Sequence, residues 1–301
     1  FALPWHYWEG GVLWEHSHRL LGSLVGFLAI VLVVVACLTE PRRWVRRLSL
    51  AILAAVIVQG LLGGLRVLLI NVDLAIVHGI FAQCFFCLVG FMCMVTSRWW
   101  ATAGQQTTRP VASPTWLLRL GALAVAAIFA QLVIAAAMRH YEAGLAIPDF
   151  PLTYGGVLPP TTFDEADRLS LAHITLQSAR VFSPTQMWLA FTHRVGAVVV
   201  AVVLLLLVRE VFRRHFHAGG GGLLVPALLL PVLLVIQITL GILAVLLRKP
   251  ADITTAHVAV GALTFLTTFV LYVRSLRIYS NEPGPVVARE TRSGPVGMAA
   301  A

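Results

Sequence analysis

Charged residues are scarce in this sequence. They make up 12% of the 301 residues, whereas 59% of the residues are hydrophobic and the mean hydropathy is +0.87. In an average soluble domain about a quarter of the residues are charged. The composition therefore excludes an ordinary soluble domain and indicates a protein that lies largely within a membrane.

Regular alternation of apolar and polar residues is also missing, which argues against β-strands. The sequence instead has seven continuous apolar runs, each near or above the roughly 20 residues that a helix needs to cross a bilayer. A bilayer favours helices because every backbone polar group must be paired within it. We therefore predict an all-α, polytopic membrane protein. The runs cover residues 16–38, 48–70, 74–97, 116–138, 186–208, 223–247 and 253–273.

Basic residues are few in every second connection between these runs. Fourteen arginines lie in one set of loops and in the C-terminal tail, whereas the connections at 71–73, 139–185 and 248–252 hold four arginines and one lysine. By the positive-inside rule, the arginine-rich set and the C-terminus are cytoplasmic. The net charge of +9 is thus explained by topology in a lipid bilayer, and no nucleic-acid partner is expected.

Cysteine is scarce too, and no compact metal-binding pattern accompanies it. Cys84 and Cys87 have a spacing that occurs in redox and metal sites, but they lie in an apolar run and no second pair is present. The glycine run at 219–222 follows no predicted strand, so we expect a flexible loop there and not a phosphate site. We expect buried thiols at all four cysteines, which are Cys37, Cys84, Cys87 and Cys93.

An internal repeat organises the chain. The stretch SHRLLGSLVGFLAIVLV at 17–33 is matched by THRVGAVVVAVVLLLLV at 192–208, and VQGLLGG at 58–64 is matched by IQITLGI at 236–242. AIVHGIFAQ is likewise matched by TTAHVAVGA. Two three-helix units are therefore predicted to be related by duplication. The alignment pairs His18 with His193, Gln59 with Gln237, Gly63 with Gly241 and His78 with His257.

The first copy lacks a counterpart of the apolar run at 116–138 and of the long connection that follows it. Only about 15 residues precede His18, so we expect the chain to begin within the corresponding outer loop. The complete protein would then form two pseudo-symmetric four-helix bundles, with seven of eight helices visible here. The predicted parts are an N-terminal half-bundle (1–100), a cytoplasmic linker (101–115), a C-terminal half-bundle (116–280) and a disordered cytoplasmic tail (281–301).

Four of the ten histidines lie in or at the ends of the predicted spans, near the outer side: His18, His78, His193 and His257. A single imidazole in a membrane is often a packing residue, but four at matched positions each need a partner. An iron porphyrin, held between two facing helices by two imidazoles with its propionates outward, would serve each pair. Zinc is less suited, because no compact four-ligand spacing is present.

A carboxylate distinguishes the two copies. Glu15 precedes His18 by three residues and shares its helix face, whereas the matched residue before His193 is Ala190. This asymmetry is expected if the first site transforms its haem and the second only carries electrons. The alternative is a carboxylate that stabilises the helix N-terminus. His16 lies about 200° around the helix from His18, so both cannot face one iron.

Three arginines are candidates for contacts with haem propionates. Arg19 and Arg194 each follow a predicted ligand, and Arg66 lies near the outer end of its helix. The alternative for these side chains is snorkelling to lipid phosphate.

The motifs EHSHR, VHG, THR, AHVAVGAL and GLAIPDFPLTYG resemble those of the haem A synthase family over almost the whole chain. The resemblance implies an eight-helix bundle that oxidises the C8 methyl group of haem O to the formyl group of haem A, with haem B as cofactor. By position, it implies that His18 and His78 bind the substrate haem, that His193 and His257 bind haem B, and that Glu15 is catalytic.

The resemblance also has implications for location and partners. It implies the bacterial inner membrane, and haem O synthase and haem-copper oxidase assembly factors as partners. The loop charges predict that the haem sites lie toward the outer side. The electron acceptor and homo-oligomerisation stay open. The outer loop IPDFPLTY lacks the cysteines that some members carry, so no disulfide is expected there.

A function of another class uses the same four ligands. A di-haem b-type cytochrome would transfer electrons from quinol and alter neither haem. Two features favour the enzyme: Glu15 in the first copy, where the second copy has Ala190, and the outer-loop motif. A transporter built from repeats also explains the duplication, but the repeats here run parallel and the histidines pair.

Overall fold

The computed structural model describes residues 10–103, 115–172, 181–216 and 222–279. Within these ranges there is no strand, apart from an isolated bridge between Thr153 and Gly156. The all-α prediction is confirmed. The helices are α1 (Gly10–Thr39), α2 (Arg43–Leu68), α3 (Val72–Val95), α4 (Arg98–Thr102), α5 (Thr115–His140), the 3-10 turn η3 (Ala143–Leu145), α6 (Phe163–Ala172), α7 (Pro184–His215), α8 (Leu224–Leu246) and α9 (Ala251–Tyr279).

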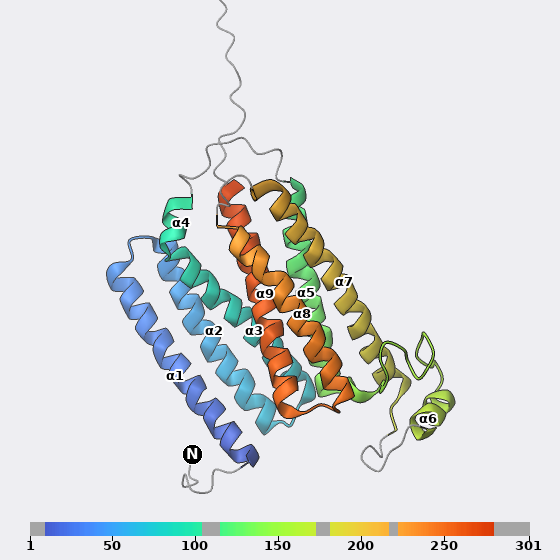
Figure 1. Cartoon of the computed structure of the whole chain (residues 1–301). Coiled ribbons are helices and arrows are strands. Elements are labelled where there is room, and N and C mark those ends of the chain that lie inside the picture. Colours follow the sequence, from blue (N-terminus) through green and yellow to red (C-terminus); the bar gives the residue numbers. More distant parts are fainter. Residues whose placement is uncertain (1–9, 104–114, 173–180, 217–221, 280–301) are drawn as a thin grey trace, which may run out of the picture.

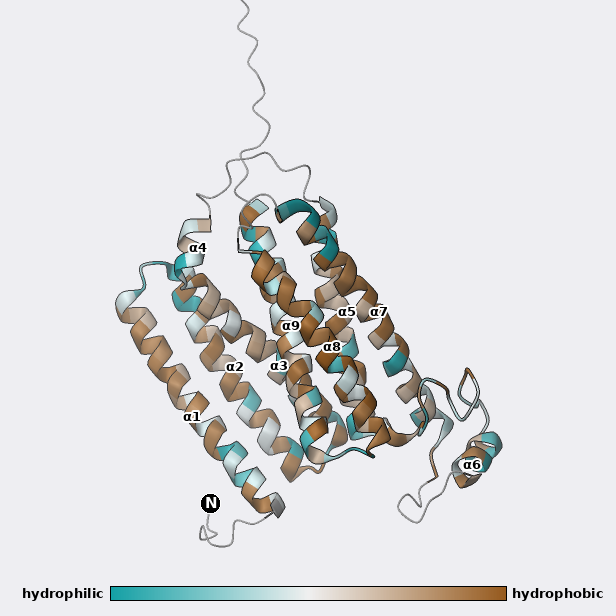
Figure 2. Ribbon diagram, in the orientation of Figure 1, coloured by the Kyte–Doolittle hydropathy of each residue, from teal (hydrophilic) through white to brown (hydrophobic). Residues whose placement is uncertain are grey.

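Seven of the described helices are long and apolar enough to cross a bilayer: α1, α2, α3, α5, α7, α8 and α9. Each contains most or all of one predicted apolar run. They lie side by side in one bundle (Figure 1), and Figure 2 shows apolar residues over most of their length. The chain is a multi-pass membrane protein. The eighth helix stays a prediction.

Four of the long helices, α1, α5, α7 and α9, extend at both ends beyond the apolar runs that predicted them, whereas α8 lies within its run. α7 has 32 residues and continues to His215, seven residues past the predicted run. It begins with Pro184 after an N-cap at Ser183, whose hydroxyl accepts from the backbone N–H of Gln186. Capping groups and proline at the first position fix helix starts, whereas a hydropathy run marks only the part inside the bilayer.

The bundle has two halves that meet along α3. In the first half α1 packs on α2 and α2 packs on α3. In the second half α5 packs on α7 and α9, and α8 packs on α7 and α9, while α3 contacts both α5 and α9. This packing does not test the residue boundaries that were predicted for the two half-bundles, the linker and the tail. Most of the predicted linker, the glycine run except Gly222, and the predicted tail lie outside the described residues.

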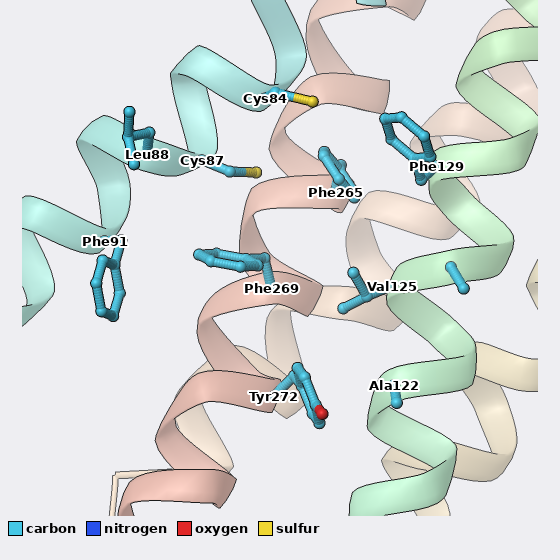
Figure 3. A pocket seen from close by; sticks show the side chains of 11 residues that line it. Cys84, Cys87, Leu88, Phe91, Ala122, Val125, Phe129, Phe265, Phe269 and Tyr272 are labelled. Atoms are coloured by element: carbon cyan, nitrogen blue, oxygen red, sulfur yellow. The ribbon is translucent and has the colours of Figure 1, made fainter. Parts of the chain in front are cut away.

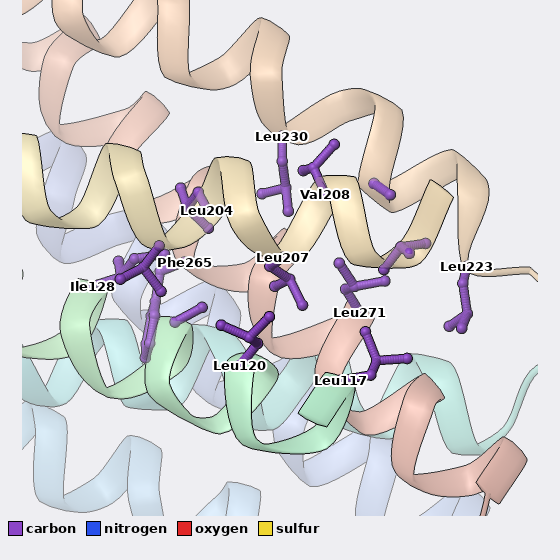
Figure 4. Close-up of a cluster of buried hydrophobic side chains, with 14 of the residues drawn as sticks. Leu117, Leu120, Ile128, Leu204, Leu207, Val208, Leu223, Leu230, Phe265 and Leu271 are labelled. Atoms are coloured by element: carbon purple, nitrogen blue, oxygen red, sulfur yellow. The ribbon is translucent and has the colours of Figure 1, made fainter. Parts of the chain in front are cut away.

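The main core belongs to the second half. Side chains from α5, α7, α8 and α9 interdigitate there, and several are almost fully buried. Figure 4 shows Leu120, Leu207, Leu230 and Leu271 directed toward one another from these helices. The first half has a smaller cluster, centred on Val45, Ile52 and Val95.

The two halves are tied at both ends of the bundle. We call the end at which α1 begins, and near which the four predicted ligand histidines lie, the histidine end. There the hydroxyl of Tyr141 donates to Asp73 of α3 at 3.1 Å. At the opposite end, the guanidinium groups of Arg274 and Arg277 on α9 lie 4.7 and 4.9 Å from the ring centroids of Trp99 and Trp100. Such cation–π contacts stabilise the seam.

Candidate functional site

The four predicted ligand histidines lie at similar depth in the bundle. His18 is eight residues from the start of α1, His193 is nine residues from the start of α7, and His78 and His257 are each six residues from the starts of α3 and α9. At 1.5 Å per residue these positions are roughly 9 to 14 Å from the histidine end of their helices. The fold therefore brings all four imidazoles into one layer.

In the first half, His18 and His78 face each other across α1 and α3. Their ring centroids are 6.4 Å apart and the rings are nearly perpendicular, at 86°. An imidazole nitrogen binds a metal at about 2 Å, so two imidazoles on opposite sides of one metal have centroids about 6 Å apart. The separation of His18 and His78 therefore fits two imidazoles that bind one metal from opposite sides. An edge-to-face contact between two rings has a similar separation.

In the second half, His193 of α7 and His257 of α9 lie within electrostatic range of each other. Both are half-buried, whereas His18 in the first half is exposed. The second pair is therefore the more enclosed of the two.

A glycine packs against one imidazole of each pair. A Cβ atom placed on Gly63 would lie 3.1 Å from Cε1 of His78, and one placed on Gly241 would lie 3.0 Å from Cε1 of His257. These are tighter than ordinary van der Waals contacts. The matched glycines thus let α2 and α8 approach the imidazoles closely, and the repeat seen in the sequence is reproduced in three dimensions.

A glutamine one turn from each glycine contacts the same imidazole. Nε2 of Gln59 lies 3.5 Å from Nε2 of His78, and Nε2 of Gln237 lies 3.4 Å from Nε2 of His257. Within the described part of the chain, Nδ1 of both histidines is buried without a hydrogen-bond partner. Buried polar atoms are rarely left unpaired in proteins, so each ring has one nitrogen whose partner the described residues do not supply.

A third glutamine, which the sequence analysis missed, contacts His193. Nε2 of Gln131 on α5 donates to the carbonyl oxygen of His193 at 2.7 Å and lies 3.0 Å from its Nδ1. A Cβ atom on Gly196 would overlap Oε1 of Gln131, so this glycine makes room for the amide. The signal was a glutamine in the middle of an apolar run, together with glycine at position 196, where the first copy has Leu21.

Glu15 and Arg19 pair with each other on the surface of α1. Arg19 donates to a carboxylate oxygen of Glu15, and their side chains are 40% and 51% exposed, respectively. The residue matched to Glu15 in the second copy, Ala190, is only 5% exposed. His16 is buried, and its Nδ1 lies 3.0 Å from the carbonyl oxygen of Val12.

Arg194 anchors the loop that covers the histidine end of α7. Its guanidinium donates to the carbonyl oxygens of Leu152 at 3.0 Å and Ile147 at 2.9 Å, and it lies 5.8 Å from the ring centroid of Phe150. A guanidinium has five N–H groups, so donors remain for another acceptor. Arg66 lies one turn from Gly63 on α2, within electrostatic range of His78.

The same loop is closed by a carboxylate. Asp149 accepts from the backbone N–H groups of Tyr154 at 2.8 Å and Gly155 at 2.9 Å, and Tyr154 donates its hydroxyl proton to the carbonyl oxygen of Ala146. Burial acts to raise the pKa of Asp149, but the N–H groups of Gly155 and Tyr154 outweigh it, so the pKa lies below its usual value. Gly155 has a φ of +77°, which favours glycine.

An apolar cavity of about 440 Å³ lies at the seam between α3, α5 and α9. Figure 3 shows the thiols of Cys84 and Cys87 and the rings of Phe129, Phe265 and Phe269 around it. All four cysteines are free, as expected, but only Cys87 is buried. The prediction of buried thiols is wrong for the other three, because a residue that faces lipid can be as apolar as one in a core.

The described residues contain no group of three or more His, Cys, Asp and Glu side chains suited to a metal ion. The candidate sites are pairs. Two imidazoles facing each other from separate helices are typical of haem ligation and not of a structural zinc site.

Fold and site together define a multi-pass, all-α membrane protein in which a duplicated unit carries matched pairs of histidines. The chain belongs to the COX15-CtaA family of cytochrome oxidase assembly proteins, whose family model matches residues 9–269. The matched segment contains both histidine pairs, Glu15 and the outer loop, and it confirms the predicted family. A search of curated proteins found no match for this chain. The family gives the chain a role in cytochrome oxidase assembly.

Proposed function

We propose that this protein is a haem A synthase, which oxidises the C8 methyl group of haem O to the formyl group of haem A for haem-copper oxidases. The observation that carries the proposal is the asymmetric duplication of one site. Each copy has two histidines, one of which packs against a matched glycine and glutamine, but only the first copy has a carboxylate, Glu15, on the ligand face. The role of the family in cytochrome oxidase assembly supports it.

The asymmetry of the two copies supports the assignment of the two pairs. His18 and His78 would hold the substrate haem O, because Glu15 lies one turn from His18 on the same helix face. His193 and His257 would hold the resident haem B, because both are half-buried and Gln131 fixes the orientation of His193. Contacts of this kind to a metal ligand strengthen binding. When bound, haem B supplies a one-electron redox centre.

Glu15 would handle protons at the substrate. Oxidation of a methyl to a formyl group adds one oxygen atom, and with water as its source it releases four electrons and four protons in two two-electron steps, so the carbon becomes electrophilic as electrons leave. The carboxylate of Glu15, oriented by Arg19, would accept a proton or position a water beside that carbon. General acid–base groups typically accelerate such steps by about 10² to 10⁴.

The arrangement of charges supports a location as well. By the positive-inside rule, the distribution of arginines among the loops favours a histidine end on the outer side and a C-terminus in the cytoplasm of a bacterial cell. Haem O synthase would supply the substrate, and haem-copper oxidase assembly factors would take the product. The electron acceptor is left open.

Analysis of the bound haems tests the proposal against a di-haem b-type cytochrome. The purified full-length protein should show low-spin, bis-histidine haem spectra and should yield haem B together with haem O or haem A on extraction. His193→Ala or His257→Ala should remove the haem B signal and leave part of the other signal. Haem B alone, at both pairs, would assign the chain to electron transfer.

A further inference from the structure

A second cavity, of about 300 Å³, opens at the histidine end where the two halves meet. The first half contributes the end of α2, the turn that follows it and the start of α3. The second half contributes His140, the last residue of α5. The cavity is therefore built by both halves.

This cavity lies directly beyond the imidazole of His78. Arg66, which lines it, is one turn from Gly63 on the same face of α2, and Gly63 packs on His78. Ala75, which also lines it, is one turn from His78 on the same face of α3. One helical turn is about 5 Å, so the cavity begins about that far from the ring, toward the histidine end.

The polar groups in the cavity favour an anion. Arg66 and His140 are both half-buried and lie within electrostatic range of each other. Among the described residues, neither side chain forms a hydrogen bond or ion pair with another side chain. The neighbouring carboxylate, Asp73, accepts from the hydroxyl of Tyr141. A permanently charged guanidinium beside an imidazole N–H, without an ion-paired acid, is suited to a carboxylate.

We propose that Arg66 and His140 bind a propionate carboxylate of the substrate haem, so that the second half completes the substrate site of the first. This inference rests on the proposed function. The residue matched to Arg66 in the second copy is Ala244, so that copy has no equivalent guanidinium on its α8. The pocket is thus a second difference between the two copies, in addition to Glu15, and it selects for a haem with free propionates.

Titration of the full-length protein with two forms of one porphyrin tests this. The protein, carrying haem B at its second pair, is placed in phosphatidylcholine nanodiscs and titrated with iron protoporphyrin IX or its dimethyl ester. The wild type should bind the free acid at least about tenfold more tightly than the ester, since charge-assisted hydrogen bonds contribute about that much. Arg66→Ala and His140→Ala should each weaken binding of the acid and leave the ester unchanged.

Matched variants exclude a general effect of charge or folding. Arg139→Ala removes an exposed charge beside His140 and should bind both porphyrins as the wild type does, while Arg66→Lys should keep part of the preference. The haem B spectrum reports folding in every variant.

The outcomes that overturn the proposal are distinct. Equal affinity of the wild type for acid and ester would overturn it and leave the proposed function intact. If the affinities are equal and phosphatidylglycerol binds the wild type more tightly than it binds Arg66→Ala, the pocket belongs to a lipid headgroup. If neither porphyrin binds at His18 and His78, the proposed function fails as well.

Discussion

The two halves carry the same histidine arrangement in different packing. We compared one apolar stretch of 18 residues in each spanning helix. Only 6 to 11% of these residues are buried in α1, α2 and α3, against 17 to 39% in α5, α7, α8 and α9. The glycine and glutamine neighbours of His78 and His257 nevertheless agree closely. The difference shows that packing around a repeated site can change while the contacts to its ligands are kept.

Removing the carboxylate that only the first half has should produce the largest effect. We expect Glu15→Gln to lower turnover by about 10² to 10⁴, because the amide cannot accept a proton. Haem binding should persist, since His18 and His78 remain. Haem O, or its partly oxidised alcohol form, should then accumulate in place of haem A, as chromatography of extracted haems would show.

The matched replacement Glu15→Asp keeps the charge and should retain more activity than the amide. If Glu15→Gln makes haem A at a near wild-type rate, the carboxylate is only a residue of the helix end and the functional difference between the halves must lie elsewhere.

A core leucine and its counterpart test the difference in packing. Leu207 on α7 is almost fully buried, and its match in the first copy, Leu32, is only half-buried. We expect Leu207→Ala to lower the free energy of unfolding by about 2 to 4 kcal/mol and Leu32→Ala by about 1 kcal/mol. Thermal unfolding followed by circular dichroism measures both.

Leu206 provides the control, because it adjoins Leu207 and faces outward. Leu206→Ala should change stability by at most about 0.5 kcal/mol. Equal losses for Leu207→Ala and Leu32→Ala would contradict the claim that the halves are packed differently.

The matched glycines allow each haem site to be weakened separately. A methyl group on Gly63 or Gly241 would press on the adjacent imidazole and should lower the affinity of that site for haem by about tenfold. Gly63→Ala should affect only the substrate haem, and Gly241→Ala only haem B. Spectroscopic titration of each site gives the affinities.

Gly64→Ala is the matched control on α2, because a Cβ atom there would meet no other described residue within 4 Å. It should leave both affinities unchanged. Loss of both haems in Gly63→Ala would mean that the sites are not independent.

The smallest effect should come from the loop that covers only the second half. The pKa of Asp149 is lower in the folded loop than its unfolded value of about 4. Its stabilising contribution is therefore complete above pH 4 and is lost as the pH falls through the folded pKa. Protection of the Tyr154 and Gly155 amides from hydrogen exchange, measured relative to their intrinsic exchange rates at each pH, should fall below pH 4 in the wild type and should be low at pH 7 in Asp149→Asn.

The sequence predicted the parts of the site that occur twice. Duplication paired His78 with His257 and Gly63 with Gly241, and the structure places each glycine against its histidine. Gln131 was missed because its helix has no copy in this chain with which to compare it. The loop contacts of Arg194 were missed for another reason: they join residues more than 40 positions apart, and no local pattern encodes such a contact.

The length of α7 has a consequence for how the protein sits in its bilayer. Its 32 residues make a rod about 48 Å long, whereas the hydrocarbon layer is about 30 Å thick. An ordinary tilt of about 20° shortens the projection only slightly, so α7 must extend well into the headgroup region. The end that carries Glu210 and its partners Arg213 and Arg214 then reaches water even in a thick membrane. Lipid chain length should therefore matter less to α7 than to α8, whose 23 residues just match the hydrocarbon layer.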